Sequence, residues 1–351
     1  MGLLKVILCD IIEAQVVNVG VIGCGHWGPN HIRIFSTLAD SRVTWATDLS
    51  SERLEFIKTT YPQLSVSADY KDVLKDSRVH AIVIATSAAT HYEIVKDCLE
   101  SEKDVLCEKP LTCRVEESEE LVDLAERKKK ILMVGHTFLF NTGIQKLKDY
   151  VRDGTLGKVY YVYSRRVNLG PIRNDVNVIW DLASHDISIF HYLFGTLPIE
   201  VSAKGESFLQ DGLEDVAFIS LTYPDSVLAN AHVSWLDPRK VREITIVGDK
   251  KMVIWDDLNP EDTIRLYERG VAQEPYYKDF GEFQLIPKEG DVTIPKLLLS
   301  EPLRNQDKHF IECVKRRVRP LSDGVFGSQV VQVLEAAQKS LRNNGEMVKI
   351  K

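Results

Sequence analysis

The chain has 351 residues, of which 44% are apolar and 27% are charged. This composition is typical of a globular protein, and the length suits two domains. Because 44 basic and 51 acidic side chains leave a net charge of −7, nucleic acid and anionic membranes are disfavoured as main partners. No apolar run approaches the roughly 20 residues that span a bilayer.

Two further features bear on cellular location. The apolar stretch within residues 1–15 is interrupted by Lys5, Asp10 and Glu13, and no cleavage pattern of small residues follows it. We therefore expect a short N-terminal extension rather than a targeting segment. The six cysteines form no CxxC pair, so we expect reduced thiols in a cytoplasmic protein and no metal ligands among them.

In residues 16–141, short β-branched runs alternate with longer segments of helical spacing. Continuous apolar strands that alternate with helices indicate a parallel sheet covered on both faces. The pattern therefore predicts a doubly wound α/β domain, with strands at 16–22, 43–47, 81–85, 104–107 and 131–134 and helices that include 93–99 and 117–125.

After residue 142 the strand-like runs follow one another closely, separated by turn signals. Short links between consecutive strands indicate a mainly antiparallel sheet, so residues 142–351 are predicted to form an α+β domain. Residues 268–302 are expected to be irregular, and the last helix is expected to pack back towards the first domain. The predicted strands are 159–167, 200–207, 216–222, 227–234, 243–247, 252–255 and 263–267, and the predicted helices are 184–194, 305–316 and 327–341.

The first strand leads directly into a glycine turn, Gly23-Cys24-Gly25-His26-Trp27-Gly28. Gly23 permits the tight turn, Gly25 lets backbone amides approach a pyrophosphate, and Gly28 allows close packing of helix on strand. A helix that begins near His26 would point its N-terminal amides at the phosphates. His26 and Trp27 therefore belong to the predicted site, and the strand–turn–helix context predicts dinucleotide binding.

Asp48 ends the second predicted strand, 20 residues after Gly28. A carboxylate at this position would accept both ribose hydroxyls of an adenosine and repel a 2′-phosphate, which favours NAD over NADP. Two alternatives remain open. Asp48 could instead cap a helix that starts near Ser51, and Arg53 could hold a 2′-phosphate.

Thr86 follows a buried strand, at the edge where open α/β sheets bind their ligands. Thr86 and His91 are therefore candidates to line the nicotinamide. A helix-surface or capping role for His91 is the alternative.

Glu108-Lys109-Pro110 follows the next strand at the same edge. A partly desolvated lysine beside a nicotinamide would have a lowered pKa and could exchange a proton with a substrate hydroxyl. Pro110 would stiffen the loop. We therefore expect Glu108 and Lys109 in the cofactor site, with Lys109 also catalytic and in contact with substrate, although the tripeptide is common and a solvated lysine is the alternative.

Asp181 and His185 stand four residues apart, so they share one face of a helix. A carboxylate can orient an imidazole and stabilise its protonated form, which gives an acid–base group. The alternative is that both residues serve helix capping and packing, with Asp186 capping or facing solvent. No third ligand is clustered with them, so we expect no metal.

In order and spacing these motifs resemble the glucose–fructose oxidoreductase/inositol dehydrogenase/MocA family, from about Val16 to the C-terminus. The resemblance implies an N-terminal Rossmann domain and a C-terminal domain with a large open sheet that commonly forms dimer or tetramer interfaces. It implies that Lys109 and the pair Asp181 and His185 lie near the substrate carbon and the nicotinamide. The peptide bond before Pro110 is often cis in this family.

Residues 165–177, which lead into Trp180, are similar to the sugar-nucleotide branch of that family. Guanidinium groups suit a diphosphate, and amides suit hydroxyl and acetamido groups. Ion pairs at the surface or between subunits are the alternative for each arginine. The substrate-binding candidates are Lys109, Arg165, Asn168, Arg173, Asn177 and His185.

The resemblance implies NAD-dependent oxidation of the 3-hydroxyl of UDP-N-acetylglucosamine or its uronate, in amino-sugar biosynthesis for cell-surface polysaccharide or lipid A. We expect Lys109 to take the hydroxyl proton. His185, oriented by Asp181, is expected to stabilise the developing oxyanion or to take part in the proton transfer. Which of the two is the base stays open. A dehydrogenase of inositol or another free polyol, and a non-catalytic NAD-binding regulatory protein, are the alternatives.

Overall fold

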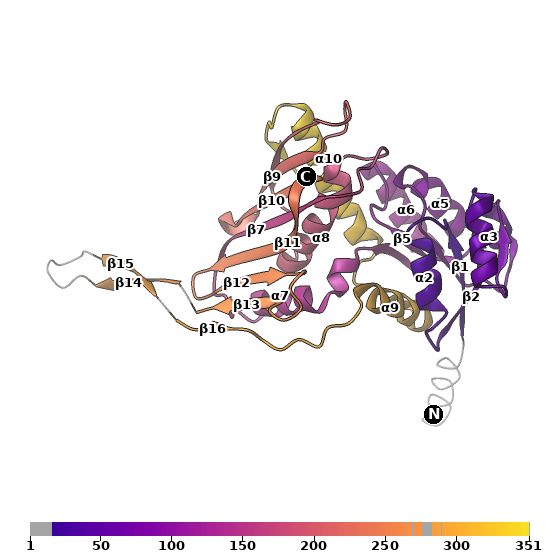
Figure 1. Ribbon diagram of the computed structural model, residues 1–351, viewed down its shortest axis with the longest axis horizontal. Coiled ribbons are helices and arrows are strands. Elements are labelled where there is room, and N and C mark those ends of the chain that lie inside the picture. The colour runs from indigo at the N-terminus through magenta and orange to yellow at the C-terminus, as the bar shows by residue number, and fades with distance from the viewer. Residues whose placement is uncertain (1–15, 269, 276–282, 289, 351) are drawn as a thin grey trace, which may run out of the picture. The chain divides into compact units, whose positions relative to one another are not determined.

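The computed structural model describes residues 16–268, 270–275, 283–288 and 290–350 (Figure 1). Contacts divide the chain into two compact units, Met1–Phe140 with Glu301–Val331, and Asn141–Ser300 with Gln332–Lys351. The predicted N-terminal extension lies outside the described residues. The predicted boundaries, 16–141 and 142–351, placed all of the C-terminal part in the second domain, whereas Glu301–Val331 belongs to the first unit. The sequence did not show this, because helical periodicity does not reveal which sheet a helix packs on.

The first unit is built on a six-stranded sheet in the order β3-β2-β1-β4-β5-β6, in which every neighbouring pair is parallel. This confirms the doubly wound α/β fold. In β4 all four side chains are buried, as a strand covered on both faces requires. The strands are β1 (Val17–Ile22), β2 (Ser41–Thr47), β3 (Ser65–Ser67), β4 (Ala81–Ile84), β5 (Asp104–Glu108) and β6 (Leu132–Gly135).

Helices connect these strands. The helix after the glycine turn begins at Gly28, two residues later than expected, with Pro29 in its first turn. Proline is favoured there because the first amides of a helix lack partners within the helix. The helices of this unit are α2 (Gly28–Phe35), α3 (Ser51–Thr60), α4 (Lys71–Lys75), α5 (His91–Glu100), α6 (Val115–Lys128) and α9 (Pro302–Arg316), and α10 (Gly324–Arg342) runs from this unit into the second.

The second unit contains a nine-stranded sheet in the order β16-β13-β12-β11-β7-β10-β9-β8-β17. All neighbours are antiparallel except β7 and β10, which are parallel. The predicted, mainly antiparallel sheet is therefore confirmed. Its strands are β7 (Val159–Leu169), β8 (Glu200–Glu206), β9 (Val216–Thr222), β10 (Leu228–Ser234), β11 (Leu236–Gly248), β12 (Met252–Asp256), β13 (Ile264–Tyr267), β16 (Val292–Thr293) and β17 (Val348–Lys349).

One face of this sheet carries the helices α7 (Thr142–Arg152) and α8 (Ser184–Phe194), as Figure 1 shows. A π-helical turn, η3 (Ile179–Ala183), precedes α8 directly. The opposite face bears aromatic side chains that are about half exposed, Tyr161, Tyr163 and Phe218. The sheet is therefore open on that face in the single chain.

The expectation that residues 268–302 are irregular was wrong in part. Two strands, β14 (Gly270–Pro275) and β15 (Phe283–Lys288), pair as a two-stranded antiparallel sheet, and β16 joins the large sheet. Charged residues and prolines in this stretch break the alternation from which strands are recognised. In the described part of the chain no helix is long and apolar enough to cross a membrane.

Candidate cofactor site and active site

The glycine turn has the geometry that its sequence predicts. Gly23 adopts φ +93°, and a Cβ on Gly28 would lie 1.9 Å from the carbonyl oxygen of Gly23. At Gly25 the nearest atom to an added Cβ is Nη1 of Arg53, at 3.5 Å. The fold thus requires glycine at positions 23 and 28, whereas at Gly25 the absence of a side chain leaves the backbone accessible to a ligand. Beside it, the rings of His26 and Trp27 are exposed and meet edge to face.

Asp48 fixes this turn from the end of β2. One carboxylate oxygen accepts the amide of Cys24 at 2.7 Å, and the other accepts the amide of Ser50 at 2.8 Å. The N-cap of α3 is Ser50, whose hydroxyl accepts the Arg53 amide, so the alternative role of Asp48 as helix cap is not what the structure shows. Arg53 contacts the carboxylate at 3.6 Å from the exposed side.

The residues of the turn fit a dinucleotide. The open backbone at Gly25 leaves space for a pyrophosphate, and α2 presents its N-terminal amides from Gly28 onward. Each carboxylate oxygen of Asp48 has a second lone pair with which to accept a ribose hydroxyl. Gly23, Gly25, Gly28 and Asp48 would hold NAD, with His26, Trp27 and Arg53 at its border.

The side chain of His91 is not exposed, and the N-cap of α5 is Thr90 rather than His91. Its ring is buried at the start of α5, with Nδ1 2.7 Å from the carbonyl oxygen of Pro110 and Nε2 3.3 Å from that of Thr86. It therefore ties the end of β4 to the loop after β5. The peptide bond between Lys109 and Pro110 is cis, as the resemblance implied, and the side chain of Lys109 is half-buried.

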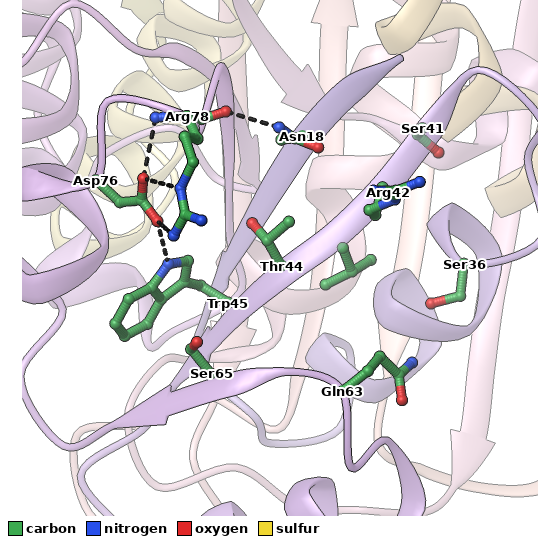
Figure 2. Close-up of a pocket in the computed structure, with 11 residues that line it drawn as sticks. Asn18, Ser36, Ser41, Arg42, Thr44, Trp45, Gln63, Ser65, Asp76 and Arg78 are labelled. Carbon is green, nitrogen blue, oxygen red and sulfur yellow. Dashed lines mark hydrogen bonds and ion pairs between the residues drawn. The ribbon is translucent and has the colours of Figure 1, made fainter.

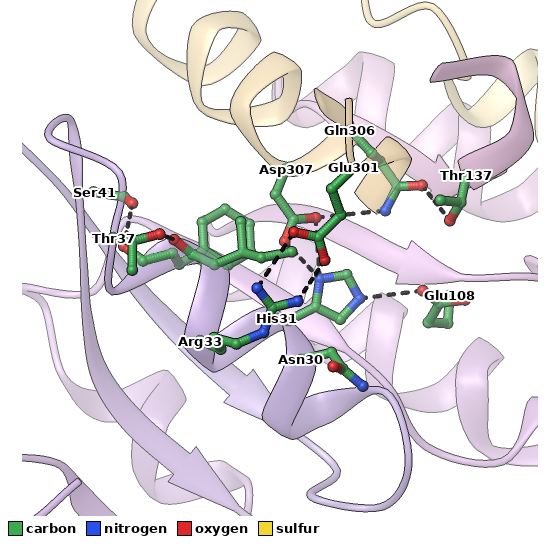
Figure 3. Close-up of polar contacts among 12 residues, drawn as sticks. Asn30, His31, Arg33, Thr37, Ser41, Glu108, Thr137, Glu301, Gln306 and Asp307 are labelled. Atoms are coloured by element: carbon green, nitrogen blue, oxygen red, sulfur yellow. Dashed lines mark hydrogen bonds and ion pairs between the residues drawn. The ribbon is translucent and has the colours of Figure 1, made fainter. Parts of the chain in front are cut away.

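Glu108 belongs to a buried cluster that the sequence did not reveal. Its Oε1 lies 3.1 Å from Nε2 of His31, and Nδ1 of His31 is 3.0 Å from both carboxylate oxygens of Asp307 (Figure 3). His31 comes three residues after Gly28, on the apolar face of α2. A histidine on an apolar helix face was the one sign in the sequence that this side chain is buried. No sequence pattern joins it to Asp307, 276 residues away.

In the second unit, Asp181 lies in the π-helical turn η3 and His185 in the first turn of α8. The two oxygens of the Asp181 carboxylate accept from Nη1 of Arg173, at 3.3 Å, and from the indole nitrogen of Trp235, at 3.2 Å. π-Helical turns are rare and occur often at functional sites. The structure thus places Arg173 beside Asp181.

Two of the other substrate-binding candidates are engaged elsewhere in this unit. Arg165 pairs with Asp237 at 2.9 Å, and because side chains alternate along β7 it shares the open face with Tyr163. The amide nitrogen of Asn177, a residue 5% exposed, donates to Glu214 and Gln338. The carbonyl oxygen of Asn177 also accepts the backbone amide of Asp181 at 3.0 Å, so Asn177 lies beside Asp181 although its side chain is bound elsewhere.

Asn168 follows near the end of β7 and is half-buried. Asp186 was expected to cap or to face solvent, and that expectation was wrong. It is buried and pairs with Arg166, which points to the helical face of the sheet, with Nε of Arg166 2.9 Å from its Oδ2. Buried charges require such a partner.

A cavity of about 690 Å³ opens at the opposite, amino end of the first unit's sheet (Figure 2). Asn18 and Ser41 line it near the starts of β1 and β2, whereas cofactors bind beyond the carboxyl ends of the strands. Asp76 in its wall accepts from both Arg78 and the Trp45 indole. This cavity is therefore separate from the candidate site. Across the described residues, no group of three His, Cys, Asp or Glu side chains could hold a metal ion.

The sequence also matches known families. Residues 17–136 match the oxidoreductase family with an NAD-binding Rossmann fold, and residues 144–254 match the GFO/IDH/MocA C-terminal domain. Myo-inositol 2-dehydrogenase of Thermotoga maritima is 27% identical over 343 residues, 93% of this chain and 96% of the relative. UDP-N-acetylglucosamine 3-dehydrogenase of Acidithiobacillus ferrooxidans is 26% identical over 316 residues, 90% of this chain and 94% of the relative.

Among solved structures, the crystal structure of GenD2 from gentamicin A biosynthesis in complex with NAD has a similar fold. It superposes with a TM-score of 0.81 over 97% of each chain, at 21% identity. The parallel sheet, the glycine turn with Asp48, and both family matches agree. The chain therefore belongs to the GFO/IDH/MocA oxidoreductase family and is an NAD-dependent dehydrogenase that acts on CH–OH groups.

Proposed function

We propose that this dehydrogenase oxidises the 3-hydroxyl of a UDP-N-acetylhexosamine, UDP-N-acetylglucosamine or its uronate, to a 3-keto sugar. The observation that carries the proposal is Arg173, whose partly exposed guanidinium lies beside Asp181 at 3.3 Å. An arginine fork suits the diphosphate of a nucleotide sugar. Asp175 and Asp181 already neutralise this arginine, so a diphosphate would have to compete with Asp175 for it.

In this reaction the substrate loses a hydride and a proton. NAD supplies the acceptor for the hydride when it is bound. Lys109 takes the proton from the hydroxyl group as the carbonyl forms, which requires the lysine to be neutral beforehand. His185, oriented by Asp181, stabilises the developing negative charge on the oxygen.

A free polyol such as inositol is the second candidate substrate. It is favoured by two observations: Arg165 pairs with Asp237, and Asn177 is bound by Glu214 and Gln338. Two of the side chains expected to recognise a nucleotide sugar are thus occupied within the protein. The inositol 2-dehydrogenase of T. maritima is also as similar to this chain as the nucleotide-sugar enzyme is.

The experiment that separates these candidates mixes the purified protein and NAD with UDP-N-acetylglucosamine, its uronate or myo-inositol. NADH formation is followed by absorbance, with a carbonyl-trapping reagent present because the equilibrium can disfavour the keto sugar. NADH with one UDP-sugar alone supports the first proposal, and NADH with myo-inositol alone supports the second.

An Arg173→Lys variant sharpens the comparison. If Arg173 binds the diphosphate, this variant should raise KM for the UDP-sugar by about tenfold, because lysine keeps the charge but loses the fork. Its KM for myo-inositol should be unchanged. If NAD binds but all three compounds are inert, the catalytic proposals fail for these substrates and a regulatory NAD-binding role gains support.

A further inference from the structure

Three buried ionisable groups meet in the first unit, beneath the carboxyl edge of its sheet. His31 of α2 is fully buried, and its two ring nitrogens face different carboxylates, Asp307 at 3.0 Å and Glu108 at 3.1 Å. Figure 3 shows the imidazole between them. The cluster joins three elements that are far apart in sequence: the helix after the glycine turn, the end of β5, and α9.

The contacts define the charge of the imidazole. A neutral histidine has one N–H and can donate to only one carboxylate, whereas the imidazolium donates to both. Burial acts to lower the pKa of His31, but the charges and hydrogen bonds of Asp307 and Glu108 outweigh it and raise that pKa to about 10. His31 is therefore a cation at neutral pH, between two acidic side chains.

The Glu108 carboxylate is fixed from several directions. Oε1 accepts from His31, Oε2 lies 3.3 Å from the backbone amide of Lys109, and a Cβ on Gly135 would come within 3.0 Å of Oε1. The neighbouring strand β6 thus leaves space for this carboxylate by having a glycine. Because Lys109 is the next residue in the chain, fixing Glu108 fixes the backbone from which Lys109 projects.

On the side of α9, Asp307 is fixed in turn. Gln306 Nε2 lies 3.5 Å from Asp307 Oδ1, and Gln306 Oε1 accepts the hydroxyl of Thr137. Buried ionic clusters are poor sources of stability, since apolar side chains of the same volume often stabilise a core as well or better. What they provide is a defined geometry, because each charge must meet its partner.

We propose that His31 is a positioning residue that holds Lys109 in register with the cofactor helix, through Glu108 and with Asp307 as its anchor. This inference rests on the proposed role of Lys109 in proton transfer. The N-terminal amides of α2 would face the pyrophosphate of a bound NAD, so the same helix would place the cofactor and, through His31, the base. Loss of His31 should displace the amine of Lys109 while leaving the glycine turn in place.

The test compares three variants of the full chain. His31→Gln and Glu108→Gln remove the charge of one member while retaining a polar side chain of similar reach. Asp104→Asn is the matched control, because Asp104 begins the same strand, is buried, and pairs with Arg317 at 2.7 Å just after α9. All three variants should lower the melting temperature, and only the first two act on the end of β5 that carries Lys109.

The primary measurement needs no substrate. Lysine amines are labelled by reductive methylation with carbon-13, the Lys109 signal is assigned by its absence from Lys109→Arg, and its shift and titration are followed by NMR. We expect His31→Gln and Glu108→Gln to move the Lys109 signal and its titration midpoint, and Asp104→Asn to leave both unchanged. The NAD affinity of His31→Gln should stay within about threefold of the wild-type value, a change of at most about 0.7 kcal/mol.

Turnover is measured second, with UDP-N-acetylglucosamine or myo-inositol, whichever the wild type oxidises. The proposal predicts that kcat falls by at least about tenfold in both cluster variants, with little change in KM, as for a group acting through the base. An unmoved Lys109 signal in both cluster variants, with stability lowered as in the control, would overturn it. If the Lys109 signal moves in the cluster variants but the wild type oxidises neither compound, the proposed substrates are refuted and the positioning role of His31 remains supported. If His31→Gln does not fold, Glu108→Gln decides alone.

Discussion

Gly25 and Gly28 stand three residues apart in one turn, yet a methyl group would meet different surroundings at each. An added Cβ lies 3.5 Å from its nearest neighbour at Gly25 and 1.9 Å from a backbone oxygen at Gly28. Gly25→Ala should therefore fold with a nearly unchanged melting temperature but bind NAD at least about tenfold more weakly, because its methyl group occupies the approach of the pyrophosphate. Gly28→Ala should lower both the melting temperature and the affinity for NAD. Calorimetric titration with NAD and thermal unfolding measure the two effects, and equal NAD affinity in wild type and Gly25→Ala would contradict the assignment.

Asp48 governs which dinucleotide is accepted. Its carboxylate accepts the Cys24 amide and would accept the ribose hydroxyls, while Arg53 lies 3.6 Å away. Asp48→Ser should weaken NAD binding by about tenfold and strengthen NADP binding, because it removes the negative charge and leaves Arg53 available for a 2′-phosphate. Measured dissociation constants for both cofactors check this. An unchanged ratio of the two constants would show that Asp48 serves the turn alone.

At the level of single residues, the sequence predicted what short-range patterns contain. The roles of Gly23 and Gly28 and the strand-end positions of Glu108 and Lys109 follow from motifs whose parts are adjacent, whereas the cis bond before Pro110 was implied by the family resemblance. It did not predict that His31 meets Asp307, nor that Asp186 is buried against Arg166. Those pairs depend on how distant elements pack.

At the level of elements, the cluster of His31 makes the fold of the first unit sensitive to pH. The pKa of His31 is raised from 6.5 in the unfolded chain to about 10 in the folded one. Its contribution to stability is therefore complete below pH 6.5 and is lost as the pH rises through 10, because unfolding then releases a proton. The charged groups that face it are Asp307 of α9 and Glu108 of β5, with the pair of Arg33 and Glu301 nearby.

We accordingly predict that the free energy of unfolding of the wild type declines between pH 6.5 and 10 more steeply than that of His31→Gln. Ionisation of Asp307 also lowers the free energy of unfolding as the pH rises, and this effect begins at a lower pH, because burial raises the pKa of Asp307 above 3.8. Urea unfolding at several pH values gives both slopes, and Asp104→Asn, which retains His31, should keep the wild-type slope. Parallel slopes for wild type and His31→Gln would contradict a protonated His31.

Element boundaries could be predicted where apolar periodicity was continuous, as in β9 and α8, whose observed bounds equal the predicted ones. The strand β3 has only three residues, none of them buried, so it left no pattern. The π-helical turn before α8 was also not foreseen, because its residues have the same apolar spacing as the α-helix that follows.

At the level of the whole molecule, we propose that the open face of the large sheet forms the interface of a homodimer or homotetramer. Tyr163 and Phe218 are 45% and 51% exposed there, and Phe218 stacks on His232 at 4.4 Å. Phe218→Glu should reduce the particle mass measured by light scattering, because it places a charge among aromatic side chains. Phe56→Glu, which changes an equally exposed aromatic residue of α3, should not. A monomeric wild type would refute the proposal.

We propose that this NAD-dependent dehydrogenase uses Lys109 as the group that takes the substrate proton. The most direct measurement compares Lys109→Ala with the wild type, in NAD binding and in NADH formation on the compound that the wild type oxidises. We predict a loss in kcat of at least about 10²-fold, the usual effect of removing a general base, with the dissociation constant for NAD nearly unchanged. Near-normal turnover by Lys109→Ala would show that another group takes the proton.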